Sequence, residues 1–168
     1  MAPAEQSEAP LVRPAEFADA LAIFRQIKAH PQELVPRPIS DIVANIDRFL
    51  VAEALPGELI GTVAWAVWPE PNPVDLPSVE VQSLSVSPAW RGLGLGRALV
   101  EAAVERIRRL QAKQVVVLTF TPDFFAKLGF EPVSKESLMY KLFHGCMHCT
   151  RYASPFTCPE QAMALRLS

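Results

Sequence analysis

The chain has 168 residues, 50% of them hydrophobic and 20% charged, which is typical of a globular domain with a core of its own. A formal net charge of −2 and a pI near 5.9 give no electrostatic case for nucleic acid or an anionic membrane as a partner. No apolar run approaches the ~20 residues of a membrane span, and the first residues lack the basic region and apolar core of a signal peptide. The cytoplasm is therefore the expected location.

Hydrophobic periodicity predicts strands and helices in alternation along the chain. Helices are expected from Pro14 through Ile27, from an N-cap at Ser40 through Phe49, over 94–111, and over 122–128 before Gly129. Strands are expected at 11–13, 50–53, 59–68, 79–86, 115–120, 130–133 and 162–167. The proline-rich stretches between these elements are interpreted as connections.

The resulting order, β-α-α-β-β-β-α-β-α-β, is that of a mixed α/β protein. The chain shows no internal repeat and no sign of a second domain. Residues 1–168 are therefore predicted to form one domain, with a core over about 11–133 and a cysteine-containing C-terminal segment over 134–168.

A glycine-rich turn, Arg91-Gly92-Leu93-Gly94-Leu95-Gly96, joins the predicted strand 79–86 to the long helix. Such a turn directs free N–H groups and the positive end of the helix dipole at one point, which suits a phosphate. The P-loop pattern does not fit because the chain has no Lys-Ser or Lys-Thr pair, and the dinucleotide pattern fails because Arg97 stands at its third glycine. The pattern Arg/Gln-x-x-Gly-x-Gly/Ala does fit, at Arg91, Gly94 and Gly96.

That pattern resembles the signature of the Gcn5-related N-acetyltransferases (GNAT), and the preceding Leu84-Ser85-Val86-Ser87-Pro88-Ala89-Trp90 is similar to what leads into it in that family. A second segment, Phe124-Phe125-Ala126-Lys127-Leu128-Gly129-Phe130, resembles the helix-to-strand segment with which the family closes over coenzyme A. The resemblance covers residues from about Leu11 to Val133. It implies the GNAT acyl-CoA N-acyltransferase fold, with a central mixed, mostly antiparallel sheet flanked by helices.

A narrower resemblance covers nearly the whole chain. Leu34-Val35-Pro36-Arg37-Pro38, Leu118-Thr119-Phe120, and Cys146-x-x-Cys149 followed by Cys158-Pro159-Glu160 are similar to short, single-domain N-acetylglutamate synthases. The resemblance implies transfer of the acetyl group of acetyl-CoA to a primary amine by direct attack in a ternary complex, with L-glutamate of arginine biosynthesis as the favoured acceptor. Another small amine, a protein amine and a non-catalytic acetyl-CoA sensor are the alternatives, and a homodimer is left open.

The wider resemblance to the GNAT family assigns residues to the acetyl-CoA site. Main-chain groups of Leu84, Ser85 and Val86 would bind the pantetheine arm, with one N–H facing the thioester carbonyl. The pyrophosphate would be wrapped by Arg91, Gly92, Leu93, Gly94, Leu95, Gly96 and Arg97. Thr119, Phe124 and Phe125 are further cofactor candidates, and Thr119 is equally well explained as a β-branched strand former. Phe125 stands where the family often has a Tyr as general acid, but a thiol of pKa ~8.5 leaves with little protonation.

Two charged residues are candidates for the chemistry and for substrate binding. Glu80 is the candidate general base, because the family frequently places a catalytic glutamate four residues before the position of Leu84; the alternative is a surface carboxylate at a strand edge. Arg37 is the candidate partner for a substrate carboxylate, since guanidinium binds carboxylates bidentately; the alternative is an ordinary surface residue. Arg13 and Lys141 are weaker candidates for the same role.

The C-terminal segment carries a cluster of groups that bind metals: His144, Cys146, His148, Cys149 and Cys158. A Cys-x-x-Cys with a third Cys and a nearby His is compatible with a structural zinc site. Against it, the second pair of ligands lacks regular spacing, and free thiols often serve as small apolar side chains. No metal site is assigned, and a structural zinc ion is left open.

Overall fold

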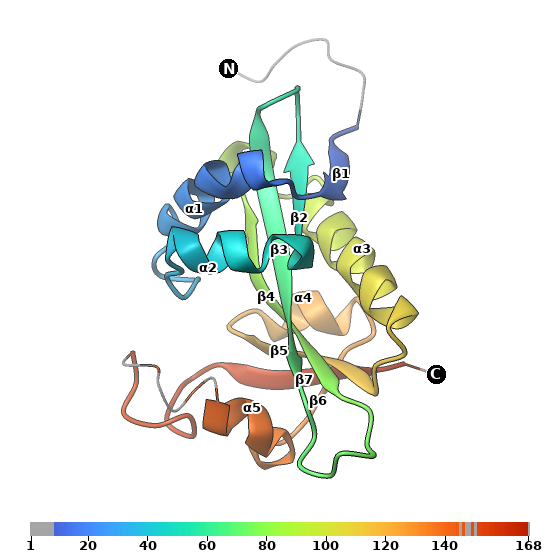
Figure 1. Cartoon of the computed structure of the whole chain (residues 1–168). Coiled ribbons are helices and arrows are strands. Elements are labelled where there is room, and N and C mark those ends of the chain that lie inside the picture. The colour runs from blue at the N-terminus through green and yellow to red at the C-terminus, as the bar shows by residue number, and fades with distance from the viewer. Residues whose placement is uncertain (1–8, 145, 147–148, 150, 168) are drawn as a thin grey trace. The chain divides into compact units, whose positions relative to one another are not determined.

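The computed structural model describes residues 9–144, 146, 149 and 151–167, which form a seven-stranded sheet and its flanking helices (Figure 1). The strands are β1 (Leu11–Pro14), β2 (Phe49–Glu53), β3 (Leu59–Trp68), β4 (Ser78–Val86), β5 (Gln114–Thr119), β6 (Glu131–Pro132) and β7 (Gln161–Arg166). The helices are η1 (Phe17–Asp19), α1 (Ala20–Lys28), α2 (Ile39–Ala44), η2 (Ile46–Arg48), η3 (Pro88–Trp90), α3 (Leu95–Arg109), α4 (Pro122–Ala126), η4 (Lys135–Leu138) and α5 (Met139–His144). None of the described helices is long and apolar enough to cross a bilayer.

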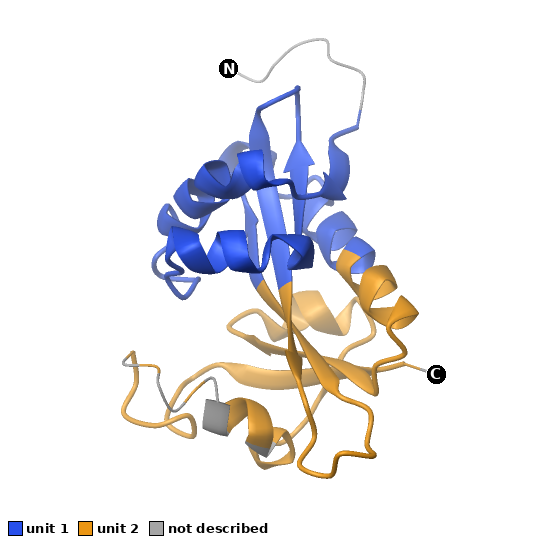
Figure 2. Ribbon diagram, in the orientation of Figure 1, with its two compact units in different colours: residues 1–64, 83–102 blue, residues 65–82, 103–168 orange. Residues whose placement is uncertain are grey.

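The strand order in the sheet is β1-β2-β3-β4-β5-β7-β6. β1 with β2, β2 with β3, β5 with β7 and β7 with β6 pair antiparallel, and β4 pairs with β5 in parallel. The predicted mixed class with a mostly antiparallel sheet is confirmed. The chain forms two compact units, residues 1–64 with 83–102 and residues 65–82 with 103–168, so that β3, β4 and α3 contribute to both (Figure 2).

In the first unit, α1 and α2 cover one face of the β2–β3 pair. Their apolar side chains form a core with those of the two strands: Ala20, Ile23, Ile27, Leu34, Ile42, Phe49, Val51 and Ala64. On the opposite face, a Cβ on Gly61 would come within 3.0 Å of Leu99 Cδ1 and 3.1 Å of the Ser85 backbone oxygen. Glycine at this place therefore lets α3, which follows the glycine turn, pack directly against β3.

The second unit is built on β5. Its parallel partner β4 is in register at Ser78, Val79 and Glu80, and β7 pairs with it from Gln114 to Thr119. A small core of Val116, Leu138, Ala162 and Ala164 joins these strands to η4. The C-terminal segment is thus part of this unit, because it supplies both a sheet strand and core side chains.

Several predicted boundaries were wrong. Pro14 ends β1, opposite Leu50, and the following helical stretch begins only at Phe17 after the Glu16–Asp19 capping box. Ser40 lies inside α2, which begins after Pro38, so it is not the N-cap. Phe49 has helical spacing from Ile46, but it pairs with Ala64 and starts β2, because pairing and burial override a short local pattern. The helices η4 and α5 were not predicted.

Candidate active site

The glycine turn adopts a left-handed backbone at two of its glycines. Residues 91–94 form the turn and α3 begins at Leu95. Gly92 and Gly94 have φ values of +77° and +83°, and a Cβ added at either would meet no atom within 4 Å. Glycine is therefore required here by the left-handed backbone and not by crowding within the chain. The turn leads directly into the N-terminus of α3, whose first N–H groups have no intrahelical partner.

The two arginines of the turn are exposed and already paired. Arg91 Nε donates a hydrogen bond to the Val86 backbone oxygen at 3.1 Å, and its Nη2 lies 3.8 Å from Glu33 Oε2. Arg97 Nε lies 2.7 Å from Glu101 Oε1, one helical turn along α3. Exposed pairs of this kind stabilise a fold by little, so both guanidiniums can exchange partners at small cost.

The end of β4 that precedes the turn is held by a buried hydrogen-bond network. Ser85 Oγ accepts a hydrogen bond from Gln26 Nε2 at 2.8 Å and lies 3.2 Å from His30 Nδ1. His30 Nδ1 in turn lies 2.8 Å from the Gln26 backbone oxygen. The side chain of Ser85 thus contacts Gln26 on α1 and His30 just after that helix. These contacts hold the strand around the main-chain groups of Leu84, Ser85 and Val86. Sequence reasoning missed His30 and Gln26, because no local pattern connects them to β4.

Glu80 is not the surface carboxylate that was the alternative reading of the sequence. It is 4% exposed in the second unit. Its Oε2 accepts hydrogen bonds from Trp68 Nε1 at 2.8 Å and from Gln82 Nε2 at 2.7 Å. Its Oε1 lies 3.2 Å from Lys141 Nζ. These four residues are called the Glu80 cluster below.

Two further groups influence the charge balance of the Glu80 cluster. Lys141 is 9% exposed, and its Nζ lies 3.1 Å from Cys146 Sγ. Burial lowers the pKa of Lys141, but the charges of Glu80 and Cys146 raise it, and the net direction is upward. Burial raises the pKa of Glu160, against the opposing effect of Lys141 and a hydrogen bond from Cys158. Lys141 is therefore a cation that interacts with two carboxylates.

Arg37 is half-buried in the first unit and lies between α1 and α2. Its Nε lies 2.7 Å from Asp41 Oδ2, and its guanidinium stacks over the ring of Phe49 at 4.9 Å from the centroid. Nη1 makes only a long contact, 3.4 Å, to Ser83 Oγ on β4. One edge of the guanidinium is thus oriented by Asp41, and the other edge makes only the long contact to Ser83. Ser83 itself has a φ of +52°, which is unusual for a residue other than glycine in a strand.

The two weaker candidates for carboxylate binding, Arg13 and Lys141, already form ion pairs with carboxylates of the chain. Arg13 forms ion pairs with both Asp19 and Glu53. These contacts lower the pKa of Asp19 and that of Glu53. Lys141 is held by Glu80, as described above. Of these three cations, Arg37 is the one with an edge that carries only a weak contact.

The remaining cofactor candidates lie in the second unit. Thr119 is buried, and its Oγ1 accepts a hydrogen bond from the Thr121 backbone N–H at 2.9 Å, so it caps the turn before α4. Phe125 is buried between Phe124 and Phe130, with edge-to-face ring contacts to both. These contacts explain both residues structurally, and their part in cofactor binding stays a prediction.

The cysteine cluster lies partly outside the described residues. Within the described part of the chain, no three His, Cys, Asp or Glu side chains gather as a metal site would require. Cys146, Cys149 and Cys158 are free thiols. His148 and the side chain of His144 are not described, so the zinc hypothesis stays as the sequence left it.

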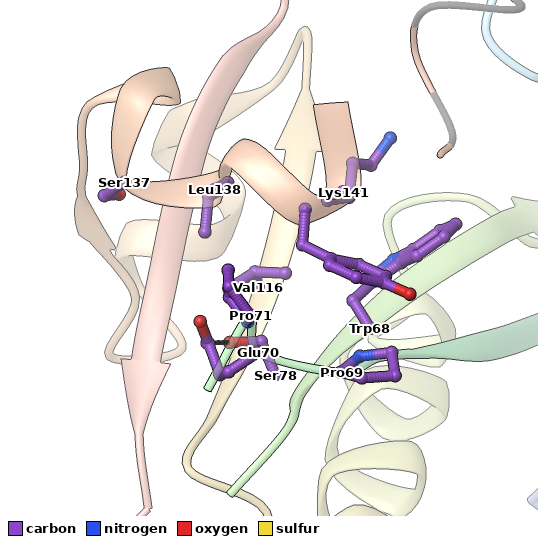
Figure 3. Close-up of a pocket in the computed structure, with 10 residues that line it drawn as sticks. Trp68, Pro69, Glu70, Pro71, Ser78, Val116, Ser137, Leu138 and Lys141 are labelled. Carbon is purple, nitrogen blue, oxygen red and sulfur yellow. Dashed lines mark hydrogen bonds between the residues drawn. The ribbon is translucent and has the colours of Figure 1, made fainter. Parts of the chain in front are cut away.

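A pocket of about 140 Å³ adjoins the Glu80 cluster within the second unit (Figure 3). It is lined by Trp68, Pro69, Glu70, Pro71, Ser78, Val116, Ser137, Leu138, Tyr140 and Lys141. Trp68 and Lys141 thus line the pocket and also contact Glu80. Lys141 extends from α5 away from Glu70 and Ser78, which close the other end of the pocket through a 3.0 Å hydrogen bond.

Comparisons with known proteins identify the family of the chain. Residues 45–132 match the family model of the GNAT acetyltransferase domain. An uncharacterized N-acetyltransferase of Chlorobaculum tepidum is 32% identical over 93% of this chain and 96% of its own length. An amino-acid acetyltransferase of Mycobacterium tuberculosis is 30% identical over 80% of this chain and 75% of its own.

Two solved structures are informative. A Mycobacterium tuberculosis protein in complex with CoA is 26% identical, with a TM-score of 0.77, over 95% of this chain and 100% of that one. An N-acetylglutamate synthase of Neisseria gonorrhoeae, complexed with coenzyme A and N-acetyl-glutamate, is 20% identical. Its TM-score is 0.76, over 97% of this chain and 36% of that chain, and at this identity the likeness shows the fold alone.

Proposed function

This chain belongs to the GNAT family of acetyl-CoA-dependent N-acetyltransferases, and we propose that its acceptor is the amino group of L-glutamate. The observation that carries the choice of acceptor is the half-buried guanidinium of Arg37, held by Asp41 on one edge and weakly occupied on the other. A dicarboxylic amino acid needs such a cation, and the 30% identical relative from Mycobacterium tuberculosis is an amino-acid acetyltransferase.

Acetyl-CoA binding is assigned in this proposal to the glycine turn and the end of β4. The main-chain N–H groups of residues 91–97 and the start of α3 bind the pyrophosphate, because Gly92 and Gly94 allow the phosphates to approach the backbone. Main-chain groups of Leu84, Ser85 and Val86 bind the pantetheine arm, and one N–H stabilises the oxyanion on the thioester carbonyl. The Gln26–Ser85–His30 network keeps this strand rigid before the cofactor arrives.

The proposed reaction is a direct transfer between two bound substrates. The acceptor arrives as an ammonium ion and loses one proton to Glu80, directly or through a water molecule. The neutral nitrogen attacks the thioester carbon and forms the C–N bond. The C–S bond then breaks, and coenzyme A leaves as a thiolate that takes up the second proton, which the nitrogen releases as it becomes an amide. The buried carboxylate of Glu80 suits the first step, because the hydrogen bonds from Trp68 and Gln82 hold its orientation.

The first test is release of free thiol from acetyl-CoA by the purified protein, with L-glutamate and with a panel of other amines. Saturable release that depends on glutamate supports the proposal. Release with a different small amine or a protein amine keeps the acetyltransferase and discards glutamate. No release with any amine, in protein shown to bind acetyl-CoA, points to the sensor.

Arg37→Met tests the part of the proposal that names the acceptor. Loss of a charge-assisted hydrogen bond of about 1.5–3 kcal/mol should raise KM for glutamate roughly 10- to 150-fold and leave the affinity for CoA unchanged. Arg13→Met is the matched control, since Arg13 is a similarly buried arginine occupied by Asp19 and Glu53. It should reduce stability without changing KM. Equal KM effects in the two variants would remove Arg37 from the acceptor site.

A further inference from the structure

The C-terminal segment contributes one cation to the Glu80 cluster. Lys141 lies on α5, beyond the residues 45–132 that the family model matches. Its Nζ lies 3.2 Å from Glu80 Oε1, and the side chains of the two residues are 11% and 6% exposed. The pair is therefore a buried ion pair between strand β4 and a helix that the family pattern does not cover.

We propose that Lys141 is a positioning residue whose ammonium holds Oε1 of Glu80 while the neutral donors hold Oε2, so that its charge favours the carboxylate form. The proposal rests on the proposed role of Glu80 as proton acceptor. Trp68 and Gln82 donate to Oε2 only, and both are neutral donors. Lys141 is a cation, and it contacts Oε1.

Lys141 supplies a charge that the two neutral donors lack. A carboxylate taken out of water favours its protonated form, and an opposite charge within about 4–6 Å restores the ionised form by an amount worth roughly 1–3 pKa units. Two neutral hydrogen bonds contribute in the same direction but carry no net charge. Because the net effect on the pKa of Lys141 is upward, the ammonium stays charged over the pH range in which amines are acetylated.

Other titratable groups lie near the pair, and one of them, Arg151, is a cation that acts on Glu160. Glu160 interacts with both members, and the burial that raises its pKa keeps it a weaker competitor for the ammonium. Cys146 contacts Lys141 from the residues after α5, and Cys158 donates to Glu160. Lys135 Nζ donates to the backbone oxygens of Pro155 and Cys158, so it anchors the same segment without contacting Glu80.

The test compares pH profiles of kcat/KM for the wild type, Lys141→Met and Lys141→Arg. Methionine removes the charge and keeps the length of the side chain, so protonation of Glu80 becomes easier. The acid limb of the profile should therefore move to higher pH by about one to three units. Arginine keeps the charge and should restore the limb to near its wild-type position. Lys135→Met is the matched control and should leave the limb unchanged.

A second readout does not depend on activity. Carbon-13 NMR of labelled glutamate carboxyl groups follows the titration of Glu80 directly, with its signal assigned by its loss in Glu80→Gln. The signal should titrate at higher pH in Lys141→Met than in the wild type. If Lys141→Met fails to fold, Lys141→Gln removes the charge and keeps a hydrogen-bond donor, and it takes its place.

The outcomes separate the inference from the proposed function. An unchanged titration of Glu80 in a folded, uncharged variant, or an equal shift in Lys135→Met, overturns the role of Lys141. A shifted titration together with full activity of Glu80→Gln also overturns it, because Lys141 would then act on a group that takes no part in the reaction. Absence of thiol release by the wild type, with the NMR shift present, defeats the proposed function and leaves the electrostatic effect of Lys141 standing.

Discussion

The glycine turn and the Glu80 cluster have different proposed roles and use different chemical groups. The turn binds through the main chain: its glycines adopt left-handed φ values, and its arginines are exposed and replaceable. The Glu80 cluster is made of side chains: a carboxylate, an ammonium, an indole and an amide, each with its partner fixed within 3.2 Å. A phosphate can be held by backbone dipoles, whereas proton transfer needs a titratable side chain whose surroundings set its charge.

This difference predicts that the two regions fail in different ways. A defect in the Glu80 cluster should reduce the rate of chemistry and spare cofactor binding. A defect in the turn should weaken cofactor binding and spare the titration of the catalytic group. The predictions below use that separation.

The largest effect is expected from Glu80→Gln. The substitution keeps the size of the side chain and removes its basicity, so kcat should fall by about 10²- to 10⁴-fold. The affinity for CoA, measured by calorimetry, should stay at the wild-type value. Full activity of this variant at all pH values would exclude Glu80 from the mechanism, and a large loss of CoA affinity would show that the two regions are not independent.

Gly94→Val is expected to have the next largest effect, and this effect should be on the affinity for CoA alone. Gly94 has a φ of +83°, and a β-branched residue in that region is strained by about 1–3 kcal/mol. The turn should relax to another conformation, which lowers the affinity for CoA by roughly tenfold or more. Calorimetric titration with CoA measures this directly.

The chain offers a matched control for this variant. Gly57, in the β2–β3 hairpin, also has a φ of +83° and no atom within 4 Å of an added Cβ. Gly57→Val should therefore carry a similar strain and leave CoA affinity unchanged. If Gly94→Val binds CoA as the wild type does, the turn is not the phosphate site.

The same contrast explains what the sequence could predict. The glycine motif is six adjacent residues, 91–96, so a phosphate site could be predicted from the order of Arg91, Gly94 and Gly96 alone. Glu80 was found because a family pattern points to its place on the strand. Its partners were not found, because Trp68 and Lys141 lie 12 and 61 residues away along the chain. Such contacts arise from sheet pairing and from packing of the C-terminal segment, which no local periodicity encodes.

The helix boundaries failed for a related reason. Apolar spacing around Ile46 and Phe49 favours a helix, and the structure ends that helix because Phe49 gains more from pairing with β3 in the core. In the same way, η4 and α5 carry little periodicity of their own. Leu138 of η4 is buried because it packs in one core with Val116, Ala162 and Ala164 of the sheet.

The smallest effect is expected from Glu160→Gln, which tests whether burial of Glu160 or its attraction to Lys141 is the larger effect. Burial raises the pKa of Glu160 above its ordinary value of 4.5, so the folded state binds a proton there more tightly than the unfolded state does. The stability of the wild type therefore falls as the pH rises from about 4.5 through the pKa of the folded state. The glutamine variant has no such proton to lose. It should have a higher free energy of unfolding than the wild type at pH 7, by less than about 1 kcal/mol because part of the carboxyl is exposed to solvent, and no advantage at pH 4.

Urea unfolding at the two pH values measures this difference, with Glu136→Gln on the exposed surface of η4 as the matched control. The control should show no gain that depends on pH. A loss of stability in Glu160→Gln at pH 7 would mean that the attraction of Lys141 outweighs the burial of Glu160. In that case Glu160 would be a strong competitor of Glu80 for the ammonium. The Glu80 cluster would then have to be described as one lysine shared equally by two carboxylates, and the effect of Lys141→Met on the acid limb of the pH profile should be correspondingly smaller.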